Sequence, residues 1–128
     1  MNADKQLQLV TYEQAKRLKA LGFDWTVYEY YREETKEWTY PDFSGYDNSA
    51  VNDISAPAVA LALKWIRDEK KIKCCVEFYG KDEYTYNIYT KTGARIFTHM
   101  RVDDHSIADS ALLDELLTLL EEKNEYTF

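Results

Sequence analysis

The chain has 128 residues, of which 45% are hydrophobic and 30% charged, and it carries a formal net charge of −7. This length fits one domain with a single sizeable core, and the composition is that of a soluble globular protein. The acidic balance disfavours direct binding to nucleic-acid phosphates or to anionic membranes.

The start of the chain and its two cysteines indicate in which cellular compartment the protein is expected. Residues 1–6 contain no apolar signal-peptide core, and no apolar run approaches the roughly 20 residues that cross a bilayer. Cys74 and Cys75 are adjacent, and on a strand such neighbours point to opposite faces, so they cannot readily form a disulfide with each other. We therefore expect a reduced, cytoplasmic protein without membrane association.

A capped helix opens the chain. Thr11 and Gln14 have the spacing of a capping box, in which each side chain bonds the backbone amide of the other residue. Ala15, Leu18 and Leu21 then share one helical face, and Gly22 suits a left-handed C-terminal cap. The pattern predicts a helix from Tyr12 to Leu21.

A hairpin and a long loop follow. The aromatic and β-branched segment Trp25–Tyr31 predicts a strand, and Glu37–Tyr40 predicts a second strand after a polar break. Residues Asp42–Asp53 are rich in Asn, Asp, Ser and Gly, which favour turns. Long loops of this kind often carry function.

The central helix is predicted to begin at a cap on Ser55, with Pro57 in its first turn and the last residues near Lys70. Its expected buried face consists of Ala58, Val59, Ala62, Leu63, Trp65 and Ile66. A strand from Ile72 to Tyr79 follows. Alternation predicts that Ile72, Cys74, Val76 and Phe78 point inward, and that Lys73, Cys75, Glu77 and Tyr79 point outward.

Two more strands and a helix complete the chain. Short turns containing Gly80 and Gly93 separate strands at 83–90 and 94–99, which predicts an antiparallel meander. The last helix is expected to begin near Ser106 or Asp109 and to end at about Glu122. We predict a single α+β domain over 1–128, with an antiparallel sheet of about five strands, helices mainly on one face, and the order α-β-β-α-β-β-β-α.

Candidate catalytic groups are sparse. One cluster could bind a divalent metal: His99, Asp103, Asp104 and His105. Its spacing matches no known ligand motif, and a solvated connection between two elements also accounts for these residues. Cys75 has no histidine close in sequence to act as its base. The isolated glycines form no phosphate-binding loop. We therefore assign no catalytic residue, metal or cofactor.

The aromatic excess is the strongest functional feature. Aromatic residues make up 15% of the chain, and many of them cluster between Trp25 and Tyr46. Rows of exposed aromatic side chains are favoured at protein interfaces, although cross-strand pairing within a thin sheet also explains them. The residues that we expect to contact a partner are Tyr28, Tyr30, Trp38, Tyr40 and Tyr46.

Two segments resemble a known group. The run Val10–Lys19 with Leu21-Gly22-Phe23-Asp24, and Ser55-Ala56-Pro57 with Ala62 and Trp65-Ile66-Arg67, look like the motifs of small uncharacterised proteins of gut anaerobic bacteria and their phages. The resemblance covers most of the chain and implies a small accessory protein of a bacterial or phage genome. Residues Ser106–Leu112 depart from the group's pattern, in which a more aromatic and Glu-rich helix entry is expected. The group has no established activity to carry over.

The leading hypothesis is a non-catalytic accessory or protein-binding domain whose partner is another protein. One alternative is an acidic decoy that mimics nucleic acid and acts on a DNA-binding protein, with its carboxylates at Asp114, Glu115, Glu121 and Glu122. A second alternative is a small metal-dependent enzyme around His99 and His105.

Overall fold

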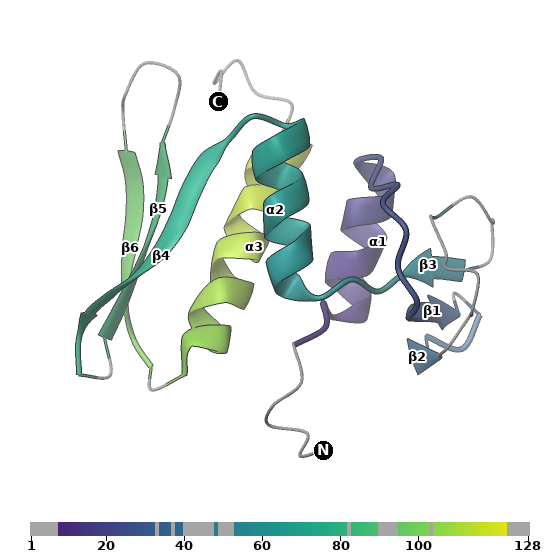
Figure 1. Cartoon of the computed structure of the whole chain (residues 1–128), viewed down its shortest axis with the longest axis horizontal. Helices are drawn as coiled ribbons and strands as arrows, with labels where there is room; N and C mark the ends of the chain where they lie inside the picture. The colour runs from purple at the N-terminus through teal and green to yellow at the C-terminus, as the bar shows by residue number, and fades with distance from the viewer. Residues whose placement is uncertain are drawn as a thin grey trace. The chain divides into compact units, whose positions relative to one another are not determined.

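The computed structural model describes residues 8–32, 34–36, 38–39, 48, 53–81, 83–89, 95–102 and 104–122, and it is α+β (Figure 1). The chain divides into two compact units, Met1–Ala62 and Leu63–Phe128, and each is described by itself. Among the described residues, no helix has the length and apolarity needed to cross a membrane.

Helix α1, Tyr12–Ala20, forms as predicted. The Thr11 hydroxyl accepts from the Gln14 amide at 3.1 Å, and the Gln14 side chain accepts from the Thr11 amide at 2.9 Å. At the other end Gly22 has a φ of 96°, and the amide of Phe23 bonds back to the carbonyl of Leu18. This left-handed turn pairs the last carbonyls of the helix, and Leu18 and Phe23 are both buried.

The first unit contains a three-stranded antiparallel sheet in the order β2-β1-β3. Its strands are β1 (Tyr30–Arg32), β2 (Trp38–Thr39) and β3 (Asp53–Ser55). The predicted hairpin therefore exists, but only the last two residues of the expected strand 25–31 belong to it. β1 is short because its hydrogen-bonded neighbours are short: β2 has two residues and β3 has three, so β1 pairs over only three positions.

The expected helix cap at Ser55 is wrong. Ser55 ends β3, and its amide donates to the Asn48 Oδ1 at 2.6 Å. Helix α2 spans Val59–Glu69, and backbone pairing replaces a side-chain cap: the Val59 amide donates to the carbonyl of Gln8 at 2.8 Å, and the Val10 amide donates to the carbonyl of Pro57 at 2.9 Å. The predicted buried positions of α2 are nonetheless buried at Val59, Ala62, Leu63, Trp65 and Ile66.

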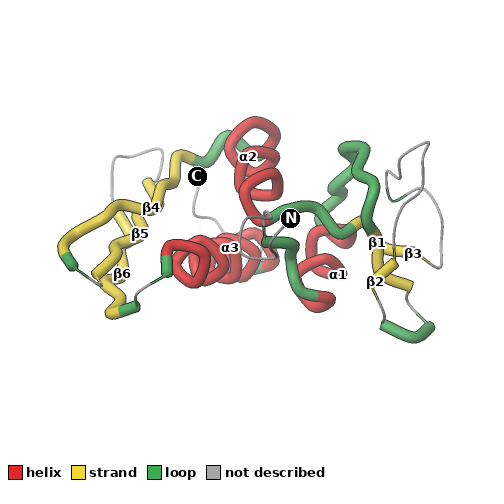
Figure 2. The backbone as a smooth tube through the Cα atoms, turned by 60° about the horizontal axis from the view of Figure 1, so that its bottom comes forward, coloured by secondary structure: helices red, strands yellow, loops and turns green. Residues whose placement is uncertain are grey.

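The second unit contains the predicted meander, a three-stranded antiparallel sheet in the order β4-β5-β6. Its strands are β4 (Lys73–Gly80), β5 (Glu83–Tyr89) and β6 (Arg95–Arg101). Helix α3, His105–Glu121, begins at a cap where the Asp104 carboxylate accepts from the Ser106 amide at 2.9 Å. Figure 2 shows α3 along this sheet, and it contacts β4 and β5. Its buried residues are Ala108, Leu112, Leu113, Leu116 and Leu117.

The sheet arrangement corrects the sequence-based prediction. The described strands form two three-stranded sheets instead of one sheet of about five, and β3 adds a strand before α2. Each sheet contacts a helix of its own unit: α1 packs on β3, and α3 packs on β4 and β5. A helix over one face of a three-stranded sheet meets the minimum that a small sheet needs for stability.

Candidate functional site

Of the five expected partner-binding residues, the structure describes the side-chain burial of Tyr28 and Tyr30. Tyr28 is exposed, at 56% of its maximal surface, whereas Tyr30 is half-buried in β1. In the register, Tyr30 pairs with Thr39, and Trp38 pairs with Tyr31. Tyr40 and Tyr46 lie outside the described residues. The expectation that the five residues form one surface therefore stays a prediction.

Part of the aromatic excess in the first unit serves packing. The rings of Tyr12 and Tyr31 meet edge to face with centroids 5.7 Å apart, and the Lys36 ammonium lies 5.6 Å from the centroid of the Tyr12 ring. The Tyr31 hydroxyl donates to the carbonyl of Val10 at 2.8 Å. These contacts hold β1 against the start of α1, as cross-element aromatic pairs commonly do.

The histidines and acids do not assemble into a described metal site. His105 bonds Asp109 at 2.9 Å one turn along α3, and Asp104 caps that helix. His99 lies in β6, and Asp103 is outside the described residues. Over the described ranges, no three His, Cys, Asp or Glu side chains are grouped so that they could hold a metal ion.

The acidic residues of the decoy hypothesis lie on the second half of α3 and, for Glu122, at its C-terminal cap. Asp114, Glu121 and Glu122 are exposed and Glu115 is half-buried. The side-chain hydroxyl of Thr118 donates to the carbonyl of Asp114 at 3.0 Å, a bond within the helix.

Strand β4 departs from the predicted inward alternation, and this departure reveals a surface that sequence reasoning missed. Ile72 and Cys74 are buried, Val76 is half-buried, and Phe78 is 69% exposed. The expectation that Phe78 points into the core is therefore wrong. A similar gradient runs along β5, where Ile88 and Tyr86 are buried and Tyr84 is half-buried.

The position of α3 and a strand irregularity explain this gradient. Phe78 pairs with Tyr84 in the sheet, and the Tyr84 ring contacts His105, the first residue of α3. The helix thus begins beside Tyr84. A register shift between Phe78 and Gly80 breaks the ladder at the same end. Such bulges are common at sheet edges, where they redirect side chains.

Three rings form a continuous aromatic row at this end of the sheet: Phe78, Tyr84 and His105. The centroids of Phe78 and Tyr84 are 5.9 Å apart, and those of Tyr84 and His105 are 5.3 Å apart, both edge to face. The Asp109 carboxylate fixes the His105 ring through its Nδ1. The row is therefore held at its α3 end and open to solvent at Phe78.

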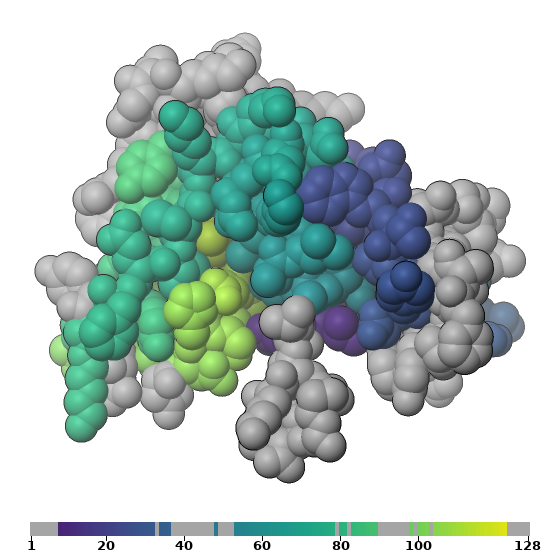
Figure 3. Space-filling view, viewed as in Figure 1, coloured from purple at the N-terminus to yellow at the C-terminus, as the bar shows by residue number. Residues whose placement is uncertain are grey.

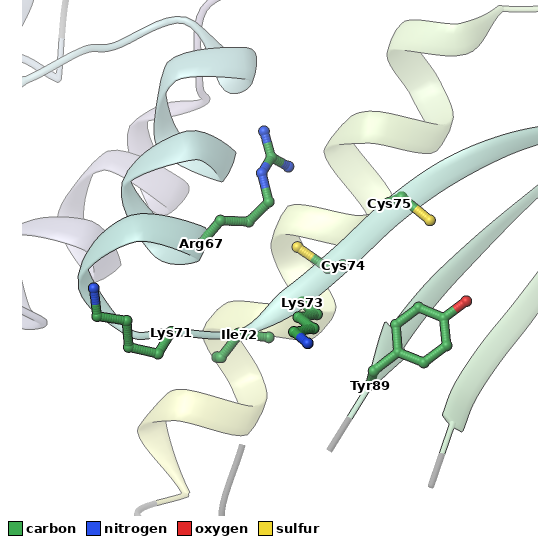
Figure 4. Close-up of a pocket in the computed structure, with 7 residues that line it drawn as sticks. All are labelled: Arg67, Lys71, Ile72, Lys73, Cys74, Cys75 and Tyr89. Atoms are coloured by element: carbon green, nitrogen blue, oxygen red, sulfur yellow. The ribbon is translucent and has the colours of Figure 1, made fainter. Parts of the chain in front are cut away.

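A groove of about 600 Å³ lies at the opposite end of β4 (Figure 4). Figure 4 shows Arg67 near the end of α2, Lys71 just after that helix, and Tyr89 on β5. We call this the β4 groove; its lining residues are Arg67, Lys71, Ile72, Lys73, Cys74, Cys75 and Tyr89. Its three charged residues are all cations, and all three are exposed.

The two thiols beside the β4 groove are free and lie on opposite sides of the strand (Figure 4). Burial raises the pKa of the Cys74 thiol, against an opposing hydrogen bond from Arg67. Partial burial also raises the pKa of Cys75; the Asn87 amide opposes this rise and the Glu77 carboxylate adds to it. Both sulfurs are therefore thiols at neutral pH, whereas cysteine nucleophiles react as thiolates.

Strand β4 has one free edge in the described part of the chain. It pairs with β5 on one side, and none of the described strands pairs with it on the other. Figure 3 shows atoms of β4, in teal, at the molecular surface. This edge runs from the β4 groove to the aromatic row, and an edge strand can pair with another chain.

Comparison of the chain with models of protein families, with curated proteins and with solved structures finds no match.

Proposed function

We propose that the chain is a non-catalytic accessory domain that binds another protein by pairing an extended segment of it with the free edge of β4. One observation carries the proposal: an eight-residue strand, paired on one side among the described residues, has an exposed Phe78 near its end. Strand addition obtains affinity from main-chain hydrogen bonds and specificity from side-chain pockets beside the edge.

The side chains around the edge support this function over catalysis. The aromatic row supplies an apolar anchor at Phe78, whose ring meets that of Tyr84, and Tyr84 in turn meets His105, which Asp109 holds. The thiols of the β4 groove have raised pKa values, which favours a packing role over a nucleophilic one. A partner segment of six to eight residues, roughly 20 to 27 Å long, would span the edge.

The test is panning of a phage library of random octapeptides against the purified chain. We expect enriched peptides to bind the wild type and to lose about tenfold or more in affinity for Phe78→Ser, because an exposed aromatic anchor at an interface commonly contributes this much. The matched control is Tyr28→Ser, which removes a comparably exposed ring from the first unit. Circular dichroism of both variants checks that they fold.

The same pair of variants separates the two candidate surfaces. Weaker binding by Tyr28→Ser, with Phe78→Ser unchanged, would place the interface at the tyrosines expected from the sequence and overturn the β4 proposal. A library that yields no peptide binding above that of an unrelated folded protein would reject peptide binding altogether.

A further inference from the structure

The charge around the β4 groove is opposite in sign to that of the whole chain. The net charge is −7, yet Arg67, Lys71 and Lys73 line the groove without an acidic side chain among its lining residues. Three acids flank the groove along the chain: Asp68, which forms an ion pair with Lys64 at 2.6 Å, Glu69 at the end of α2, and Glu77, whose carboxylate lies 3.6 Å from the Cys75 sulfur. The charged side chains of the lining itself are nonetheless all cationic, at the first residue of the free edge.

Lys71 occupies a position where glycine would fit the backbone better. It follows the end of α2 and has a φ of 59°, the left-handed region in which residues with a Cβ are strained. At the equivalent turn after α1 the chain uses Gly22. A lysine at such a turn retains backbone strain and supplies a cation to the groove.

From these observations we propose that the segment bound along β4 is acidic at its C-terminal end, with carboxylates in the β4 groove and an apolar side chain against Phe78. This inference rests on the proposed function. Antiparallel pairing sets the direction: it places the C-terminal end of the segment beside Lys73, where β4 begins, and antiparallel ladders are slightly more stable than parallel ones.

The geometry of a strand fixes the spacing within the ligand. Lys73 and Phe78 are five residues apart in β4, which corresponds to roughly 17 Å at the rise of an extended chain. The apolar residue should therefore precede the first carboxylate by about five positions. Carboxylates on a short peptide suit three clustered cations, whereas the acidic remainder of the chain repels a long polyanion such as a nucleic acid.

The experiment measures fluorescence anisotropy with three labelled octapeptides. The first has Phe near its N-terminus and three Glu at its C-terminus; the second replaces each Glu by Gln; the third has the first sequence reversed. We expect the first peptide to bind about tenfold more tightly than either of the others. This preference should shrink as salt is raised from about 0.1 M to about 1 M, because salt screens exposed charges.

Two variants test the cations separately. Lys73→Glu should abolish the preference for the Glu peptide, and the charge-matched control Lys16→Glu, an exposed position on α1, should retain it. Lys71→Gly should weaken binding of the Glu peptide while it raises the midpoint of unfolding, since glycine relieves the left-handed strain. A variant that is more stable but binds less separates a binding role from a structural one.

Hydrogen exchange of the complex, measured by NMR, identifies the binding mode. Amides at alternate residues of β4 should gain protection, because every second amide of an edge strand faces outward. If the Glu and Gln peptides bind equally and both protect β4, the acidic preference is wrong and the proposed function stands. If the Glu peptide binds without protecting β4, strand pairing is wrong. If a single-stranded oligonucleotide outcompetes the Glu peptide, the ligand is a phosphate polymer instead of a protein.

Discussion

The side chain of Tyr31 links the sheet of the first unit to the chain before α1. Ionisation of its hydroxyl at alkaline pH should lower the stability of the protein. The hydroxyl donates to the carbonyl of Val10, and partial burial raises its pKa above the ordinary value of 10.0. Because the folded state holds this proton more tightly than the unfolded state does, the stabilising contribution is complete below pH 10.0 and is lost as the pH rises through the folded pKa.

We therefore expect the free energy of unfolding of the wild type to fall more steeply above about pH 10 than that of Tyr31→Phe, which cannot ionise. Urea unfolding at a series of pH values between about 8 and 11 measures both curves. Parallel curves for the two proteins would show that Tyr31 does not contribute to this pH dependence.

Local hydrogen bonds explain which of these details could be predicted from the sequence. The cap at Thr11 and the left-handed Gly22 depend on residues within the same short stretch, so their spacing is sufficient evidence. Ser55 has equally good spacing for a cap, but its amide bonds Asn48 and the start of α2 pairs with Gln8. Asn48 precedes Ser55 by seven residues and Gln8 lies far away in the sequence, so neither partner falls within the span of a capping pattern.

Asn48 connects three parts of the first unit. Its Nδ2 donates to the carbonyl of Phe23 at 2.8 Å, its Oδ1 accepts from the amide of Ser55 at 2.6 Å, and its φ is 70°. It thus ties the turn after α1 to the end of β3. Asparagine suits the position because it tolerates the left-handed backbone and offers both a donor and an acceptor.

Asn48→Ala should lower the free energy of unfolding by about 2 to 4 kcal/mol, because it removes both hydrogen bonds and strains the backbone. Asn48→Gly removes the same bonds without the strain and should cost about 1 to 2 kcal/mol less than alanine does. Urea unfolding compares them. Equal stability of wild type and Asn48→Gly would show that the two bonds contribute nothing.

The candidate site shows where sequence alternation stops being informative. Near the start of β4, Ile72 and Cys74 are buried as alternation predicts, whereas Phe78 is exposed. Alternation cannot indicate how far a covering helix extends. Phe78 is exposed because α3 starts beside Tyr84. The sequence pattern leaves two alternatives for the start of that helix, Ser106 and Asp109. The sequence predicts the turn at Gly80 but gives no sign of the register shift between Phe78 and Gly80.

The β4 groove is likewise a tertiary feature. The sequence shows lysines around the end of the central helix, which the helix dipole alone explains. Only the return of β4 beside the end of α2 places Arg67, Lys71 and Lys73 around one groove with Tyr89 from β5. A cationic site on an acidic chain is thus invisible in the net charge, because the net charge averages over both units.

The prediction of a single domain concerns the cooperativity of the whole chain. The boundary between the two compact units, after Ala62, falls within α2, which runs continuously from Val59 to Glu69. Helix formation is cooperative, so loss of the turns on one side of the boundary weakens the turns on the other. We expect this shared helix to couple the unfolding of the two units.

Scanning calorimetry tests that coupling. At about 0.7 kcal/mol per residue near 60 °C, unfolding of the whole chain should absorb about 90 kcal/mol, and each unit alone would absorb about half of this. We expect one heat-absorption peak whose van't Hoff enthalpy is close to the full value. Ala60→Gly, an exposed substitution within α2, should lower the temperature of this peak without dividing it. Two peaks in the wild type, or a van't Hoff enthalpy near half the calorimetric one, would mean that the units unfold independently and that the chain is two domains.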